Sequence, residues 1–294
     1  MTEKPPLMLG LEMPDVDTWS DRVVVGLGQN PSQFTGPGTN TYLVGTGEER
    51  ILLDAGSGHP EYIPVLERAL EQAGCRAIQE IVLTHGHPDH IGGVPSILAR
   101  FGKLKVSKRP DAVFDPPFEL EISEIRDGET IETEGAHLRA LHTPGHAPDH
   151  LCFVLEEERS VFTGDNVLGV GTTVIPSDTG DLGDYMRSLA RLQGEEPTSL
   201  YPAHGPVIRD GRAKLVEYIA HRNAREAEIL AAMDGGADRI PAMVAIIYAA
   251  YPVSLHLAAG QSVGSHLLKL EAEGTVVRDG DAEATPTGVA WKRA

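Results

Sequence analysis

The chain has 294 residues, 41% of them hydrophobic, which suits one large globular domain with or without a small second one. Its 43 acidic residues outnumber its 25 basic residues, and the net charge of −18 repels phosphate backbones and anionic lipids unless a local basic patch or a metal reverses it. Because the sequence opens with no basic segment followed by an apolar run and contains no stretch of about 18 apolar residues, we expect a cytoplasmic protein that neither is secreted nor enters a membrane.

The first half of the chain alternates strand and helix patterns. Residues 23–54 contain short β-branched runs separated by turn residues, which predicts strands. Residues 61–74 carry apolar side chains at helical spacing and end in a glycine, which predicts a helix with a glycine cap. The apolar strand expected at residues 81–83 then runs directly into the stretch Thr-His-Gly-His-Pro-Asp-His, and residues 91–102 begin another helix.

Three later strand patterns also end in a polar residue that can bind a metal. They run into His146, Asp165 and His204, within the sequences TPGH, FTGD and PAHG. The carboxyl ends of strands are where α/β proteins collect their functional side chains. Four separate strand ends therefore each deliver a candidate ligand to one region of the fold.

From residue 211 onward the strand rhythm gives way to helices. Helical patterns cover residues 213–233, 240–251 and 255–274, and two short β-like segments around a turn close the chain. Helices followed by a terminal hairpin outline a winged-helix-like module. We therefore expect a domain at residues 1–210 and a small C-terminal domain at residues 211–294.

The polar cluster has the composition of a zinc site. Zinc binds imidazole and carboxylate groups where thiolates are lacking, and a hydrolytic site keeps one position open for water. Cys75 and Cys152 lack the spacing of a disulfide or a thiolate site, so we expect buried free thiols. A single histidine is more often a packing or surface residue, but that explanation does not cover all seven candidates. These candidates are His85, His87, Asp89, His90, His146, Asp165 and His204.

The motif H-x-H-x-D-H at residues 85–90 resembles that of the metallo-β-lactamase superfamily. The resemblance implies an αββα sandwich and two zinc ions. It assigns His85, His87 and His146 to the first ion, Asp89, His90 and His204 to the second, and Asp165 to a bridging position. Further stretches, including GPGTNTYLVG, TGDNVLGVGTTV and YIAHRNAREAEIL, resemble the lactamase-β-2-like branch, whose members carry a winged-helix-like C-terminal domain.

Such a site would use hydroxide held by the metals as its nucleophile, because two cations lower the pKa of bound water to near neutrality. Asp89 and Asp165 are the expected catalytic residues: Asp89 would orient the hydroxide and Asp165 would hold the two cations together. We expect Asp54 to support the site from behind the ligands, and His150 and His142 to support it or to pack in the core.

Backbone freedom and turn chemistry indicate the surroundings of the site. Gly92 and Gly93 are expected to let the following helix approach the metals closely, and the loops 30–40 and 166–184 to form substrate walls. The remaining candidates for a role, His59, His221, His256 and His266, are expected to be surface or packing residues.

The sequence indicates the substrate class less directly than it indicates the metal site. We expect hydrolysis of a small ester, thioester, lactone or β-lactam, with single-stranded RNA cleavage as the alternative because the resembling branch includes endoribonucleases. Residues 215–294 carry seven basic and ten acidic side chains, and aromatic residues make up 5% of the chain, which favours the small molecule over nucleic acid. The apolar helix near residue 247 suits a core or a homodimer surface.

Two further functions are less favoured by the sequence. A single-iron thiol dioxygenase would not use all the second-metal positions, yet Asp165 and His204 are both present, and di-iron flavoprotein members carry Glu where this chain has His87. A DNA-binding transcription factor is disfavoured by the acidic C-terminal part and the complete set of ligands.

Overall fold

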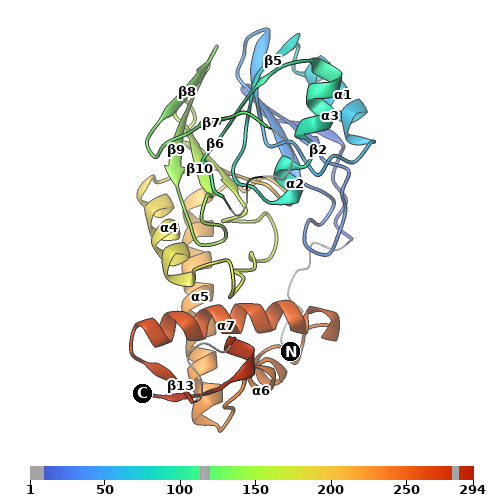
Figure 1. Cartoon of the computed structure of the whole chain (residues 1–294). Coiled ribbons are helices and arrows are strands. Elements are labelled where there is room, and N and C mark those ends of the chain that lie inside the picture. The colour runs from blue at the N-terminus through green and yellow to red at the C-terminus, as the bar shows by residue number, and fades with distance from the viewer. Residues whose placement is uncertain (1–9, 113–114, 116–119, 280–284) are drawn as a thin grey trace.

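A computed structural model describes residues 10–112, 115, 120–279 and 285–294, and two β-sheets form its centre (Figure 1). The first sheet contains, in this order, β1 (Val16–Ser20), β2 (Val23–Leu27), β3 (Asn40–Val44), β4 (Glu49–Leu53), β5 (Ala77–Val82), β6 (Lys105–Lys108) and β7 (Ile122–Glu124). The second sheet has the order β12 (Leu200–Pro202), β11 (Ser160–Gly164), β10 (Leu151–Leu155), β9 (Ala136–His142) and β8 (Thr130–Thr133).

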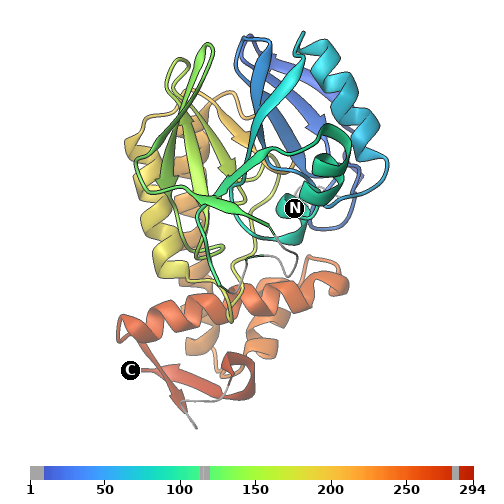
Figure 2. The same ribbon diagram turned by 45° about the horizontal axis from the view of Figure 1, so that its top comes forward.

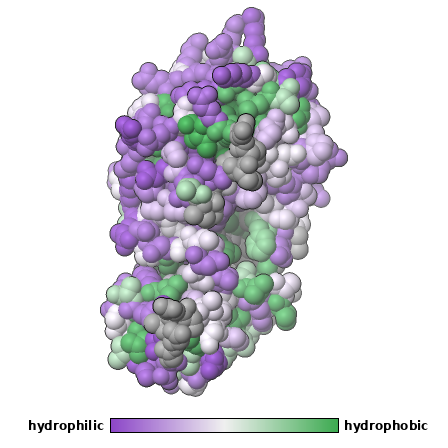
Figure 3. Space-filling model, viewed as in Figure 1, coloured by the Kyte–Doolittle hydropathy of each residue, from purple (hydrophilic) through white to green (hydrophobic). Residues whose placement is uncertain are grey.

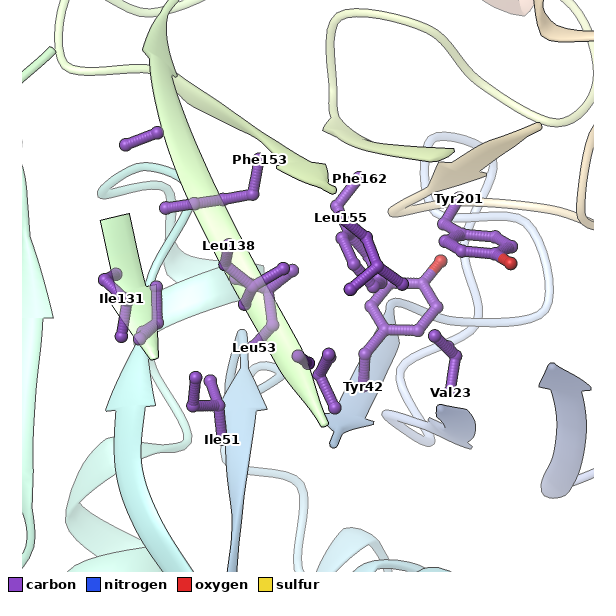
Figure 4. Close-up of a cluster of buried hydrophobic side chains, with 14 of the residues drawn as sticks. Val23, Tyr42, Ile51, Leu53, Ile131, Leu138, Phe153, Leu155, Phe162 and Tyr201 are labelled. Atoms are coloured by element: carbon purple, nitrogen blue, oxygen red, sulfur yellow. The ribbon is translucent and has the colours of Figure 1, made fainter. Parts of the chain in front are cut away.

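The two sheets pack face to face through one layer of apolar side chains (Figure 4). Successive side chains of a strand point to opposite faces of its sheet. On β10, Phe153 and Leu155 accordingly join the layer between the sheets, whereas Cys152 and Val154 face outward. Both faces of β10 are buried, which explains why its sequence reads as a continuous apolar run.

Helices cover the outer face of each sheet (Figures 1 and 2). The helices α1 (Tyr62–Gln72) and α3 (Val94–Phe101) pack on the first sheet, and α4 (Leu182–Gly194) and the start of α5 (Gly211–Asp234) pack on the second. Cys75 and Cys152 are buried free thiols in these outer layers, as expected. The layers form the expected αββα sandwich.

The C-terminal part forms a module with its own core. It consists of α6 (Ile240–Ile247), η1 (Val253–Leu255), α7 (His256–Ala272), β13 (Val276–Asp279), η2 (Pro286–Gly288) and β14 (Ala290–Arg293), and β13 pairs with β14 in an antiparallel hairpin. Met243, Val263 and Trp291 lie in its core. This arrangement confirms the predicted helices and terminal hairpin, which we call the C-terminal module.

Helix α5 joins the sandwich to the C-terminal module. Its first half places Leu215 and Tyr218 in the outer layer of the second sheet, and its second half places Ile229 and Met233 in the core of the C-terminal module. The domain boundary expected between residues 210 and 211 falls at the start of this shared helix and stays a prediction. None of the helices within the described ranges has the length and apolar character needed to cross a membrane.

Candidate metal centre

The seven candidate ligands converge at one edge of the sandwich. Strand β5 ends at Val82, and the following loop and the short helix α2 (Pro88–Ile91) carry the four residues of the H-x-H-x-D-H motif. Asp165 follows β11 directly, and His204 follows β12, which pairs in parallel with β11. His146 lies in the loop that joins β9 to β10. The predicted strand ends therefore meet at one place.

The ligand atoms form two groups, each with its atoms within 4.8 Å of one another. The first donor group contains His85, His87, His146 and Asp165. The second donor group contains Asp89, His90 and His204. The five histidines and Asp89 divide as the family resemblance implies, and Asp165, expected at a bridging position, falls in the first donor group; the roles of these residues as metal ligands stay a prediction.

Asp165 lies between the two donor groups and directs one carboxylate oxygen to each. Its Oδ2 is 3.4 Å from His146 Nε2, and its Oδ1 is 3.1 Å from His204 Nε2 and 3.4 Å from His90 Nε2. Asp89 Oδ2 lies 3.3 Å from His204 Nε2 and 3.4 Å from His90 Nε2. A carboxylate in the position of Asp165 can bridge two cations.

Several atoms of the centre fit a metal ion better than a hydrogen bond. Buried polar atoms are normally paired, yet among the described residues His85 Nε2 has no hydrogen-bond partner, and His90 Nε2 and Asp165 Oδ1 face each other at 3.4 Å without the geometry of a hydrogen bond. All three belong to the donor groups, where a cation would accept their lone pairs. Imidazole and carboxylate donors without thiolates suit zinc and similar divalent ions.

The electrostatic environment differs between the two donor groups. Burial and neighbouring histidines lower the pKa of His85, and burial together with His146 lowers the pKa of His87 to about 4. Burial opposes a charge on His204 too, but Asp165 and Asp89 outweigh it and raise its pKa to about 9. The carboxylates thus attract positive charge to the second donor group.

Asp54 and Thr84 hold His90 from behind. Asp54 Oδ2 accepts a hydrogen bond from His90 Nδ1 at 2.8 Å, and Asp54 Oδ1 accepts one from the Thr84 backbone N–H at 2.8 Å. Asp54 adopts a left-handed φ of 61°, which few non-glycine residues do. The bond to Nδ1 directs His90 Nε2 toward the donor atoms, the supporting contact expected of Asp54.

Other contacts fix the ligands of the first donor group and Asp165. His146 Nδ1 lies 3.0 Å from the carbonyl oxygen of Val174, and His150 Nε2 accepts a hydrogen bond from the Asp165 backbone N–H at 3.1 Å. His150 is fully buried, whereas His142 is partly exposed and lies 2.8 Å from the Pro148 carbonyl. His150 thus positions a candidate ligand, and His142 does not contact one.

The two glycines after the motif serve the close approach of two backbone segments. A Cβ on Gly93 would lie 1.9 Å from the Ala55 carbonyl oxygen, and one on Gly92 would lie 2.9 Å from the Ser57 carbonyl oxygen. The expected close contact therefore exists, but it joins α2 to the loop after β4 rather than to the metal positions. This contact fixes the helix that carries Asp89 and His90.

A cavity of about 890 Å³ opens beside the donor groups. The loops expected as substrate walls do line it, with Phe34 and Thr35 from one and residues 168–174 from the other. Helix α5 and the C-terminal module form the remaining wall, and Figure 3 shows the surface hollowed between the sandwich and this module. The cavity thus extends from the candidate metal centre to the C-terminal part of the chain.

Three residues of this region lie at the site although the sequence patterns did not assign them there. Thr39 Oγ1 donates to Asp89 Oδ2 at 3.2 Å, Arg222 lines the cavity, and so does His221, which was expected to be a packing or surface residue. Arg222 and His221 lie in the stretch YIAHRNAREAEIL, which resembles the lactamase-β-2-like branch but does not by itself place either residue at the site.

Known proteins are similar to this chain in sequence. Residues 34–204 match the metallo-beta-lactamase superfamily, and residues 240–286 match the beta-lactamase associated winged helix domain. An atrochrysone carboxyl ACP thioesterase of Aspergillus chevalieri is 44% identical over 221 residues, which cover 75% of this chain and 68% of that protein. A lactamase-like protein of Aspergillus niger is 44% identical over 230 residues, 78% of this chain and 69% of that protein.

The fold comparison agrees with the sequence comparison. The crystal structure of a metallo-beta-lactamase family protein from Thermus thermophilus is 26% identical, with a TM-score of 0.70, and the match covers 87% of this chain and 94% of that chain. Membership of one family therefore accounts for the sandwich, the ligand motif and the winged helix module. This chain belongs to the metallo-beta-lactamase superfamily.

Proposed function

We propose that this superfamily hydrolase is a dinuclear, zinc-dependent thioester hydrolase. The observation that carries the dinuclear part is the position of Asp165, whose two oxygens face different donor groups. The thioester part rests on the 44% identity to a protein named as an ACP thioesterase. Both parts agree with the hydrolysis of a small acyl compound expected from the sequence.

The residues of the chain prepare the centre for acyl transfer to water. Two zinc ions, when bound by the donor groups, would supply Lewis-acid activation of water and of the substrate carbonyl. Asp165 would keep the two donor groups at a fixed separation, and Asp89, held by Thr39, would accept a proton or orient the attacking water. Asp54 and Val174 keep the imidazoles of His90 and His146 in position.

The cavity supports an acyl substrate with some length. Its volume of about 890 Å³ lies toward the upper end of the usual range for small-ligand sites, roughly 300–1,000 Å³. Leu168, Val170 and Val174 line it next to the centre, and Leu255 and Ala259 line it from the C-terminal module. These apolar walls suit the hydrocarbon part of an acyl group.

The thiols of the chain are poor candidates for a competing covalent mechanism. Burial raises the pKa of Cys152 to about 12, so this thiol stays protonated at neutral pH. Burial also raises the pKa of Cys75, and neither cysteine lines the cavity. Direct hydrolysis at the metal centre is therefore the mechanism we propose.

The test combines metal analysis with a thiol-release assay. Purified protein loaded with zinc should contain about two equivalents of zinc by elemental analysis and should release free thiol from an acyl N-acetylcysteamine thioester. His87→Ala removes a donor from the first donor group and should lower kcat/KM by at least about 100-fold, since weaker changes around metal sites already cost 10- to 100-fold. His137→Ala, an exposed histidine paired with Glu157 outside the centre, should leave the rate unchanged.

Parallel substrates separate this proposal from its alternatives. Labelled single-stranded RNA and a chromogenic cephalosporin are incubated with the same zinc-loaded preparation. Cleavage of RNA or cephalosporin that is lost in His87→Ala, with all thioesters untouched, would overturn the proposal. Thioester hydrolysis that persists in His87→Ala would assign the activity to a contaminant.

A further inference from the structure

Arg222 is a buried cation that pairs with no carboxylate of the described residues. Arg222 is only 3% exposed, and no carboxylate oxygen of the described residues lies within 4.0 Å of its guanidinium. Its Nη2 donates to the Thr173 carbonyl oxygen at 2.6 Å, its guanidinium lies 5.0 Å from the centre of the Tyr185 ring, and its Nε has no acceptor. A buried charge without a counter-ion is costly, so such a group calls for an anion.

The position of Arg222 connects it to the candidate metal centre. The loop residue that accepts its hydrogen bond, Thr173, precedes Val174, whose carbonyl oxygen lies 3.0 Å from Nδ1 of the candidate ligand His146. Arg222 and the two loop residues also line the same cavity as His146. A substrate bound at the donor groups would therefore extend past this loop toward the guanidinium.

Arg222 differs from the other cations of the cavity wall. Within the described ranges, every Lys or Arg that lines the cavity comes from α5, namely Lys214, Arg222 and Arg225. Lys214 pairs with Glu217, and Arg225 pairs with Glu228 and lies over the ring of Tyr248. Arg222 is the member of this set that lacks a carboxylate. Burial and the two arginines lower the pKa of His221 to about 4, so the positive charge of this wall comes from Lys214 and the two arginines and not from His221.

We propose that Arg222, next to Arg225, forms a subsite for an oxyanion on the thioester substrate. The planar guanidinium suits bidentate binding of a carboxylate or a phosphate. This inference rests on the proposed thioester hydrolysis and adds a specificity-determining residue to it. The oxyanion belongs either to the acyl group, as a carboxylate, or to the thiol part, as the phosphate of a phosphopantetheine arm.

Three thioesters distinguish the sources of the anion. Butyryl N-acetylcysteamine is neutral, succinyl N-acetylcysteamine carries a carboxylate on the acyl group, and butyryl 4′-phosphopantetheine carries a phosphate on the thiol part. Arg222→Gln should lower kcat/KM by about 10- to 100-fold for one of the two anionic thioesters, mainly through KM, because a hydrogen bond to a charged group is lost. The neutral thioester should change by less than about twofold.

Two further variants keep the result interpretable. Arg222→Lys retains the charge and should retain part of the preference for the anionic substrate. Arg212 is an exposed cation near the start of the same helix and pairs with Glu196. Its replacement in Arg212→Gln should change none of the three rates. An equal loss for all three thioesters in Arg222→Gln would indicate a purely structural role for Arg222 and would overturn the subsite.

Direct binding separates this inference from the proposed function. Thioether analogues of the three compounds cannot be hydrolysed, and their dissociation constants can be measured by calorimetry with the zinc-loaded wild type and Arg222→Gln. If the wild type hydrolyses no thioester, the proposed function fails, but a loss of affinity confined to one anionic analogue would still establish the subsite. Equal affinities of the two proteins for all three analogues would overturn it.

Discussion

The two donor groups differ in the protonation of their histidines, although they share one carboxylate. Burial and neighbouring imidazoles lower the pKa of His85, His87 and His146 in the first donor group and outweigh the opposing charge of Asp165. In the second donor group the facing carboxylates overcome burial and raise the pKa of His90 and His204. The difference therefore comes from which charges surround each ring, because all five rings are largely buried.

This difference has consequences for metal binding. A neutral imidazole offers its lone pair to a cation at once, whereas a protonated imidazole must first release its proton. The second donor group should therefore depend more on pH and on the residues that hold its side chains in place. Three experiments test this dependence on protein stripped of metal with a chelator.

The largest expected effect comes from the residue behind His90. Asp54→Asn replaces the carboxylate that accepts hydrogen bonds from both His90 Nδ1 and the Thr84 backbone, and an amide can accept only one of them well. We expect the affinity of the second donor group for zinc to fall by about 10- to 100-fold, the usual cost of losing a residue behind a metal ligand. Competition with a chromophoric chelator resolves the two binding steps.

The first donor group provides the internal reference for this variant. Its zinc affinity should change less, because Asp54 reaches this group only through the Thr84 hydroxyl, which donates to Asp54 and lies 3.0 Å from His85 Nδ1. Asp127→Asn changes a carboxylate that pairs with Arg191 outside the centre and should affect neither step. Equal weakening of both steps in Asp54→Asn would contradict the separation of the two groups.

The next effect comes from pH. Because the pKa of His204 is raised to about 9, both nitrogens of its ring are protonated at pH 7, and zinc must displace the proton on the nitrogen that it binds. The apparent affinity of the second donor group should rise by about tenfold per pH unit for each displaced proton between pH 7 and 9, and should level off above the folded pKa. With its pKa of about 4, His87 is already neutral, so the first donor group should show no such slope.

Calorimetric titration in buffers of different ionisation enthalpy counts the released protons. We expect at least about one proton per zinc ion at the second donor group at pH 7 and none at the first. Identical pH slopes for the two steps would show that the carboxylates do not control protonation here.

The sequence predicted the ligands because their pattern is local. Three histidines and an aspartate within six residues, placed directly after an apolar strand, have no ordinary packing explanation. The later ligands were found at further strand ends, where a change from apolar to polar residues is also readable from the sequence. The sandwich itself followed from the family resemblance and not from periodicity, since short strands such as β7 and β8 were not singled out.

The residues that support the site were harder to predict because their partners are distant in the chain. Thr39 lies in a turn-rich loop, 50 residues before Asp89. Arg222 lies in a charged helical pattern that also describes a solvent-exposed face. Only the path of α5, from the outer layer of the second sheet into the C-terminal module, brings Arg222 beside Thr173.

The smallest expected effect concerns the hydroxyl that holds Asp89. Thr39→Val keeps the volume of the side chain but removes the hydrogen bond to Asp89 Oδ2. A bond of this kind contributes about 0.5–1.5 kcal/mol, so zinc affinity at the second donor group should fall by between about two- and tenfold while the first step stays unchanged. Thr41→Val is the matched control, because the Thr41 hydroxyl bonds Tyr62 and the Gly26 carbonyl in the interior, away from the ligands. This control should lower the melting temperature without changing the zinc affinity of either donor group. If Thr39→Val leaves the zinc affinity of the second donor group unaltered, Asp89 is held by its neighbouring histidines alone.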